Sequence, residues 1–392
     1  MMKEYKSEKP AHISEFAREF DFEALRPYYD HETKEVMQRI AEDATYHKAM
    51  AYLWPGISRE EAVQKALATK SPFEFQTGYM HHAIWSIVNT TSDGLSYSGI
   101  EKLDRDKAYL FVANHRDILL DSAILQIILD KEGFSTSEIT FGSNLMEQGF
   151  ITDFGKMNRM FMVKREGNVK ELYDISRQLS AYLRHTILDK NVSVWIAQRN
   201  GRTKDGNDLT QTGLLKMLNM SGGKDFKQNF SELNIVPLTI SFEYEPCDAL
   251  KVQEQYLSSL HSKYVKAPGE DLNSILTGIK QPKGKIHLTF GTPIQKELEE
   301  INQAKNENEK IRLLTVVIDK QIHQNYKLHA VNYIAYDLLN ETNVFESSYT
   351  KEEKEHFLAY IQSHVEKLNG ENDVLKNLFL KLYAFPVINK LG

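Results

Sequence analysis

The densest group of residues that could do chemistry follows a short apolar run that ends at Ala113. It reads Asn114-His115-Arg116-Asp117, and Asp121 comes four residues later. A neutral imidazole can take up a proton near pH 7, and a neighbouring carboxylate fixes its tautomer. Either Asp117 or Asp121 could supply that carboxylate. Asp117 is also well placed to cap the following helix. We favour that role for Asp117, and we therefore expect Asp121 to pair with His115.

Two groups of cations stand in the same position, directly after apolar runs. One is Lys164-Arg165-Glu166, and the other extends from Gln198 to Lys204 and contains Arg199, Asn200, Gly201 and Arg202. Arginine can hold a phosphate with two parallel hydrogen bonds. Because the carboxyl ends of parallel strands are where open α/β sheets keep their sites, the groups together predict an anionic ligand beside His115.

These residues are positioned by alternating strands and helices. The pattern predicts strands over 109–113, 138–142, 160–163, 192–197, 235–242 and 286–290, and helices over 118–129 and 169–188. Such alternation is typical of an α/β fold with a mixed, largely parallel sheet and flanking helices. Pro237 inside a predicted strand indicates an edge, a bulge or a strand start. We expect a helix over 248–264 and a loop over 266–284.

Three regions follow from this pattern. We expect a helical N-terminal region at 1–94, an α/β core at 95–295 and a helical C-terminal region at 296–392. The predicted helix over 375–385 combines leucines and phenylalanines with spaced lysines. Such a helix suits a membrane interface, but we favour the alternative that it packs back on the core.

Composition limits the class of protein. The chain has 392 residues, a hydrophobic share of 41%, a net charge of −6 and one cysteine. The charge argues against a nucleic-acid partner, and a lone Cys247 excludes an intramolecular disulfide framework and suits a reducing compartment. Neither a run of about 18 apolar residues nor a signal sequence is visible. We expect a cytoplasmic protein with no metal site.

The order of these polar groups and strands along the chain resembles that of the glycerolipid acyltransferase family, the lysophosphatidate and glycerol-3-phosphate acyltransferases. The segment 114–121 is similar to its N-H-x-x-x-x-D block, and similar counterparts of its other blocks occupy 161–165, 196–203 and 235–238. The segment 286–294 is similar to its closing strand. Two departures stand out. Five residues, not four, separate His115 from Asp121, and Asn200 precedes Gly201 where the family has a glutamate.

The resemblance implies an O-acyltransferase of membrane lipid synthesis. His115 would deprotonate an acceptor hydroxyl, Asp121 would balance the imidazolium, and Asn114 or a backbone N–H would stabilise the oxyanion. Arg165, Arg199 and Arg202, with Asn200 and Gly201, would bind the substrate. No cofactor is implied.

The partners follow from the same resemblance. They are an acyl-CoA or acyl carrier protein thioester as co-substrate, a lyso-lipid or glycerol phosphate as acceptor, and the membrane surface, on its inner face, as an interfacial contact. Two alternatives stay open. One is a hydrolase that uses the same His/Asp pair with water, and the other is a non-catalytic lipid- or phosphate-binding protein.

Overall fold

The fold is described from a computed structural model of the full chain. It describes residues 8–10, 13–142, 149–163, 167–260, 264–267 and 269–392.

A single sheet forms the centre of the molecule. In the described residues it has seven strands in the order β1-β7-β6-β2-β5-β3-β4. The strands are β1 Leu95–Ser98, β2 Leu110–Ala113, β3 Glu138–Gly142, β4 Met160–Val163, β5 Val194–Ala197, β6 Ile235–Phe242 and β7 Ile286–Phe290. All neighbours are parallel except β6 and β7. The α/β class with a mixed, largely parallel sheet is therefore confirmed.

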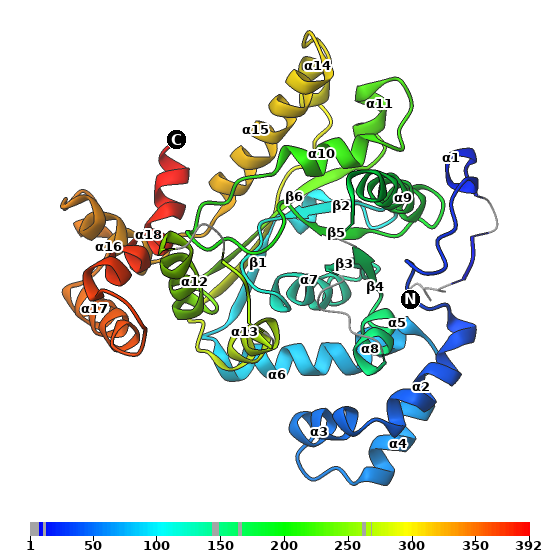
Figure 1. The fold of residues 1–392 in the computed structure, drawn as a ribbon, viewed down its shortest axis with the longest axis horizontal. Helices are drawn as coiled ribbons and strands as arrows, with labels where there is room; N and C mark the ends of the chain where they lie inside the picture. Colours follow the sequence, from blue (N-terminus) through cyan, green and yellow to red (C-terminus); the bar gives the residue numbers. More distant parts are fainter. Residues whose placement is uncertain (1–7, 11–12, 143–148, 164–166, 261–263, 268) are drawn as a thin grey trace.

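Helices cover both faces of the sheet, so its central strands are apolar on both sides. In β2, Leu110 and Val112 pack toward α9 (Val169–Leu188), whereas Phe111 and Ala113 pack toward α7 (Leu120–Lys131). Successive side chains point to opposite faces and all of them are apolar, as expected for a strand buried between two layers of helices. Figure 1 shows α9, α10 and α15 on one side of the sheet and α6 and α7 on the other.

The remaining helices have the following bounds: α1 Glu15–Arg18, α2 Thr33–Glu42, α3 Ala44–Leu53, α4 Arg59–Ala68, α5 Pro72–Glu74, α6 His81–Thr91, α8 Phe150–Met157, α10 Thr212–Asn219, α11 Phe226–Ser231, α12 Asp248–Leu260, α13 Glu270–Lys280, α14 Glu297–Ile301, α15 Glu307–Asn325, α16 Ala330–Asn340, α17 Lys351–Val365 and α18 Asn372–Leu391. Short 3-10 turns occupy Asp30–Glu32, Ile100–Lys102 and Glu346–Ser348. A π-helix, η2 Phe75–Met80, joins α5 to α6.

The two ends of the chain form helical groups with their own apolar cores. The N-terminal core is centred on Met37 and Phe75, and the C-terminal core on Phe357 and Phe379. Helix α18 packs along α16 and α12, and its Leu375, Phe379 and Tyr383 are buried. The structure thus gives the tail the packed position that we favoured. The division at 94 and 295 stays a prediction.

Three expectations for the core were wrong in detail. The segment 266–284 contains a helix, α13, where we expected only a loop. A short edge strand, β1, pairs with β7 and was not predicted. Strand β6 lies between β7 and β2, so of the three alternatives for Pro237 the edge is wrong, and the position near the strand start fits. Proline is tolerated there because the ladder to β7 begins only at Leu238, and the Pro237 carbonyl accepts the N–H of Gly291 at 2.8 Å.

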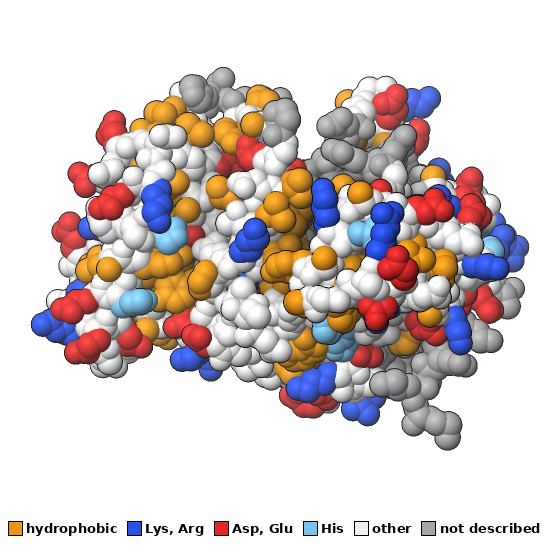
Figure 2. Space-filling model, turned by 90° about the horizontal axis from the view of Figure 1, so that it is seen from below, with side chains coloured by type: hydrophobic (Ala, Val, Ile, Leu, Met, Phe, Trp, Pro, Cys, Tyr) orange, Lys and Arg blue, Asp and Glu red, His pale blue; other side chains and the backbone are white. Residues whose placement is uncertain are grey.

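The surface in Figure 2 carries several small groups of hydrophobic side chains separated by charged ones. The large hydrophobic side chains exposed on the molecule come from different elements, such as Tyr52 of α3, Leu67 of α4 and Leu272 of α13. In the described part of the chain, no helix has both the length and the apolar content needed to cross a membrane.

Candidate active site

The sequence-predicted pair of His115 and Asp121 comes together in the structure. Nδ1 of His115 lies 2.8 Å from Oδ2 of Asp121, which stands on the first turn of α7. The same oxygen accepts the backbone N–H of Arg116 at 2.6 Å and of Asp117 at 2.9 Å. The loop between β2 and α7 therefore wraps around this carboxylate. This wrapping accommodates the extra residue between the histidine and the acid.

Asp121 is buried beneath the imidazole. Burial raises the pKa of its carboxyl well above the usual range, and the neighbouring Asp117 raises it further. The two backbone N–H groups and Lys251 act in the opposite direction. The ring of Trp195 meets the imidazole edge-on, with 5.8 Å between ring centres. His115 is thus held by a carboxylate on one side and by an aromatic ring on another.

The rival acid Asp117 has a different part in the structure. Its Oδ1 accepts the backbone N–H groups of Leu119 at 2.9 Å and Leu120 at 2.8 Å, at the start of α7. These are groups that a helix leaves without an internal partner. The geometry therefore gives Asp117 the capping position that we favoured and gives Asp121 the contact with His115.

The side chain of Asn114 makes structural hydrogen bonds. Its side-chain oxygen accepts the N–H of Ile240 at 2.8 Å, and its amide nitrogen donates to the carbonyl of Ile240 at 3.0 Å and to Asp208 at 3.2 Å. Both amide hydrogens are therefore used, and the residue is fully buried. The side chain ties β2 to β6 and has no donor left for an oxyanion.

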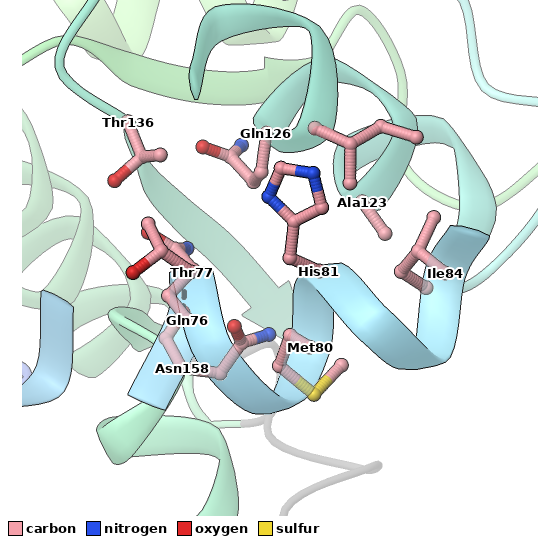
Figure 3. A pocket seen from close by; sticks show the side chains of 10 residues that line it. Gln76, Thr77, Met80, His81, Ile84, Ala123, Gln126, Thr136 and Asn158 are labelled. Atoms are coloured by element: carbon pink, nitrogen blue, oxygen red, sulfur yellow. Dashed lines mark hydrogen bonds between the residues drawn. The ribbon is translucent and has the colours of Figure 1, made fainter. Parts of the chain in front are cut away.

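A cavity of about 640 Å³ opens beside the imidazole. Its wall combines cationic side chains with apolar ones. Arg199, Arg202 and Lys204 are the cations near His115. The apolar side chains include Phe141, Val163, Leu179, Trp195, Leu214 and Met217. Ligand sites in proteins commonly have volumes of roughly 300–1,000 Å³. Another cavity, between η2 and α7, is only about 10 Å³ (Figure 3) and has room for about one water molecule. The larger cavity is therefore the candidate substrate site.

The cations after β5 line this cavity, along with Asn200 and Gly201. Nε of Arg199 and Nη1 of Arg202 are buried and have no hydrogen-bond partner among the described residues. Buried donors without a partner are rare because they lose their hydration. Because both residues line the cavity, their guanidinium groups give this wall a positive charge that favours an anionic ligand. Arg165, the third predicted arginine, lies outside the described residues.

Backbone hydrogen bonds join this cationic loop to the loop that bears His115. The N–H of Gln198 donates to the carbonyl of Ala113 at 2.8 Å, and the N–H of Thr203 donates to the carbonyl of His115 at 2.9 Å. Because β2 and β5 are adjacent and parallel, their carboxyl ends meet at the same edge. His115 and the cations are therefore fixed relative to each other.

The structure adds residues to the site that the sequence did not identify. They are Glu254 of α12, which is paired with Lys204 of the predicted cationic group, and Lys266 and Asp271 from the segment around α13. Burial lowers the pKa of Lys204 to about 8, against the opposing effect of Glu254. Nothing in the polar sequence of α12 distinguishes Glu254 from a solvent-exposed glutamate, so its place could be found only from the fold.

No group of three or more His, Cys, Asp and Glu side chains in the described residues is arranged to hold a metal ion.

Comparisons with known proteins identify no family and no function for this chain. No protein-family model matches the sequence, and no curated protein matches it. Among solved structures, the chain is similar to the 1-acyl-sn-glycerophosphate (LPA) acyltransferase PlsC from Thermotoga maritima. The identity is 12%, the TM-score is 0.35, and the match covers 73% of this chain and 93% of that one. This similarity assigns the chain to no family.

Proposed function

We propose that the protein is an O-acyltransferase of membrane lipid synthesis. It would move a fatty acyl group from a thioester donor to a hydroxyl of lysophosphatidate, glycerol 3-phosphate or a related lipid. The observation that carries the proposal is the hydrogen-bonded pair of His115 and Asp121 at the wall of a large cavity that is both cationic and apolar.

The pair supports base catalysis by its geometry. Because Nδ1 of His115 faces Asp121, the other ring nitrogen, Nε2, is the one that takes the proton of the acceptor hydroxyl. The hydroxyl oxygen attacks the thioester carbonyl, the C–S bond breaks, and the imidazolium returns the proton to the leaving thiolate. Asp121 stabilises the imidazolium in between. No covalent enzyme intermediate is needed.

The lining of the cavity supports the choice of substrate. Arg199 and Arg202 line the cavity as donors that suit a phosphate, and Lys204 adds a third cation nearby. Phe141 and Leu214 are among the apolar side chains that suit an acyl chain. In this proposal the acceptor is membrane-borne and the donor is an acyl-CoA or an acyl carrier protein thioester.

The test is an assay with the purified full chain. It is incubated with an acyl thioester and a panel of lyso-lipids and glycerol 3-phosphate, and the products are identified by mass spectrometry. An acylated acceptor supports the proposal. Free fatty acid formed without an acceptor would favour a hydrolase, and acceptor binding without turnover would favour a binding protein.

A second histidine serves as a control that distinguishes loss of catalysis from a general loss of folding. His185 is also paired through Nδ1 with a carboxylate, Asp189, at 2.6 Å, but it lies in α9 and does not line the cavity. We expect His115→Gln to lose turnover by about 10³-fold or more, as loss of a general base does at the upper end. His185→Gln should retain most of it. Equal turnover in the two variants would contradict a catalytic His115.

A further inference from the structure

A buried cluster of charges lies directly behind the base. It consists of Arg116, Asp208, Glu245 and Lys251, which we call the Arg116 cluster, and each member is at most 2% exposed. The Arg116 guanidinium donates to Asp208, to the carbonyl of Gly206 at 3.1 Å and to Glu245 at 3.1 Å. Lys251 donates to Glu245 at 2.6 Å. Two cations balance two carboxylates, which is the condition under which buried charges are tolerated.

The Arg116 cluster holds the backbone on which His115 depends. The N–H of Arg116 donates to Asp121 at 2.6 Å, and its carbonyl accepts from Nζ of Lys251 at 2.6 Å. The backbone N–H of Arg116 is therefore held by Asp121, and its carbonyl is held by Lys251 of α12. A shift of Arg116 would move the carboxylate that holds His115.

The same cluster is attached to the C-terminal helix α18. The hydroxyl of Tyr383 accepts the backbone N–H of Glu245 at 3.0 Å and donates to Asp248 at 2.7 Å. The chain of α18 also contacts the loop after β5, because a Cβ at Gly206 would lie 2.2 Å from the carbonyl oxygen of Leu382. Helix α18 thus contacts two of the segments that the Arg116 guanidinium joins.

We propose that Tyr383 of α18 is a positioning residue, which acts through Glu245 and Arg116 to fix the loop that bears His115. The C-terminal helices are then part of the active-site machinery and not an added unit. The inference rests on the proposed function, because it takes His115 to be the base. Misplacing a catalytic group by about 1 Å can lower a rate by about 10²-fold, so a remote hydroxyl can matter.

The experiment compares two isosteric variants, Tyr383→Phe and Tyr360→Phe. The hydroxyl of Tyr360 donates to the same carboxylate, Asp248, at 2.7 Å and lies in α17, but it makes no hydrogen bond to Glu245. Each variant therefore removes one hydrogen bond to Asp248, and Tyr360→Phe also removes an acceptor of the Gln281 side-chain amide. Only Tyr383→Phe removes the acceptor of the Glu245 backbone N–H. We expect kcat to fall at least tenfold in Tyr383→Phe with KM within about twofold. In Tyr360→Phe kcat should stay within about twofold.

A second readout does not depend on turnover. The Nδ1–H proton of His115 is followed by NMR in the wild type and in both variants, and it is assigned by its loss in His115→Gln. We expect the signal to shift or broaden in Tyr383→Phe and to stay in place in Tyr360→Phe. Arg116→Lys, which keeps the charge but cannot reach Asp208 and Glu245 together, should perturb the signal as Tyr383→Phe does.

The outcomes separate the inference from the proposed function. A wild type without turnover but with the expected pattern of NMR signals would refute the acyltransferase and leave the positioning role standing. A His115 signal that is the same in the wild type and in Tyr383→Phe would overturn the positioning role. So would equal changes of signal and kcat in the two tyrosine variants.

Discussion

Replacing Asp121 by asparagine tests the catalytic pair most directly. Oδ2 of Asp121 accepts from His115 and from the backbone N–H groups of Arg116 and Asp117. In Asp121→Asn these two N–H groups keep an oxygen, not the amide nitrogen, in that position. The asparagine oxygen can therefore still accept the Nδ1–H of His115, and the imidazole keeps its tautomer. Burial raises the pKa of the Asp121 carboxyl, but an imidazolium that faces it favours the ionised form. What the variant removes is the negative charge opposite the imidazolium.

The expected loss of rate follows from that charge. Two unit charges about 4 Å apart attract each other by about 4 kcal/mol at an effective dielectric constant near 20. The imidazolium that forms on proton transfer would lose a stabilisation of this size. Because about 1.4 kcal/mol corresponds to a tenfold change in rate, we expect kcat to fall by about 10³-fold.

The assay is the initial rate of thiol release from the acyl thioester in the presence of acceptor. Asp117→Asn is the matched control, since it neutralises a buried carboxylate on the same loop whose Oδ1 binds Leu119 and Leu120 at the start of α7. That variant should lose less than about tenfold in kcat. A kcat for Asp121→Asn within tenfold of the wild type, or an equal loss in both variants, would refute the assignment of Asp121 to His115.

Other consequences can be measured on the same protein. Burial lowers the pKa of Lys204 to about 8, so its charge is lost as the pH rises through 8. The affinity for glycerol 3-phosphate by calorimetry should therefore be several-fold weaker at pH 9 than at pH 7, and a flat profile in the wild type would contradict this. Gly206→Ala places a Cβ 2.2 Å from the carbonyl oxygen of Leu382 at a φ of +83°, whereas Gly201→Ala has a φ of +76° and nothing within 4 Å. In urea denaturation we expect Gly206→Ala to lower the free energy of unfolding by about 2 kcal/mol or more and Gly201→Ala by about 1 kcal/mol; equal losses would show that the contact with α18 is unimportant. Burial raises the pKa of the Cys247 thiol to about 11, so the native protein should react with iodoacetamide at pH 7.5 far more slowly than the protein in urea, and equal rates would be inconsistent with a buried thiol.

The predictable part of the site lies at strand ends. The apolar runs before His115 and before Arg199 are short, continuous and bounded by polar residues, which identifies strands buried on both faces. The carboxyl ends of parallel strands meet at one edge, and so His115 and the arginines after β5 could be placed together from the pattern alone. The pairing of His115 with Asp121 was predicted because Asp117 was assigned to the cap of the following helix, which left Asp121 as the partner.

The remainder depends on contacts between distant segments. Helix α13 was missed because its sequence is flanked by proline and glycine, and because it buries Ser274 and Gly278 while Leu272 and Leu276 are exposed. Asn114 has the residue type of an oxyanion donor, but its partner Ile240 lies 126 residues away. The hydrogen bond between Tyr383 and Glu245 joins residues that are 138 positions apart, and no local sequence pattern predicts it. Long-range hydrogen bonds of this kind are not encoded in spacing.

The pairing of the first strand with the last affects how the chain folds. Leu95 of β1 is in register with Ile286 of β7, so this edge of the sheet closes a segment of nearly two hundred residues. Closing a long loop has a larger entropic cost than closing a short one, and folds rich in such contacts reach the native state slowly. During synthesis on the ribosome, β1 leaves the exit tunnel well before β7 exists. Until then its edge is an unpaired template, and a chaperone that covers this segment would protect the nascent protein from aggregation.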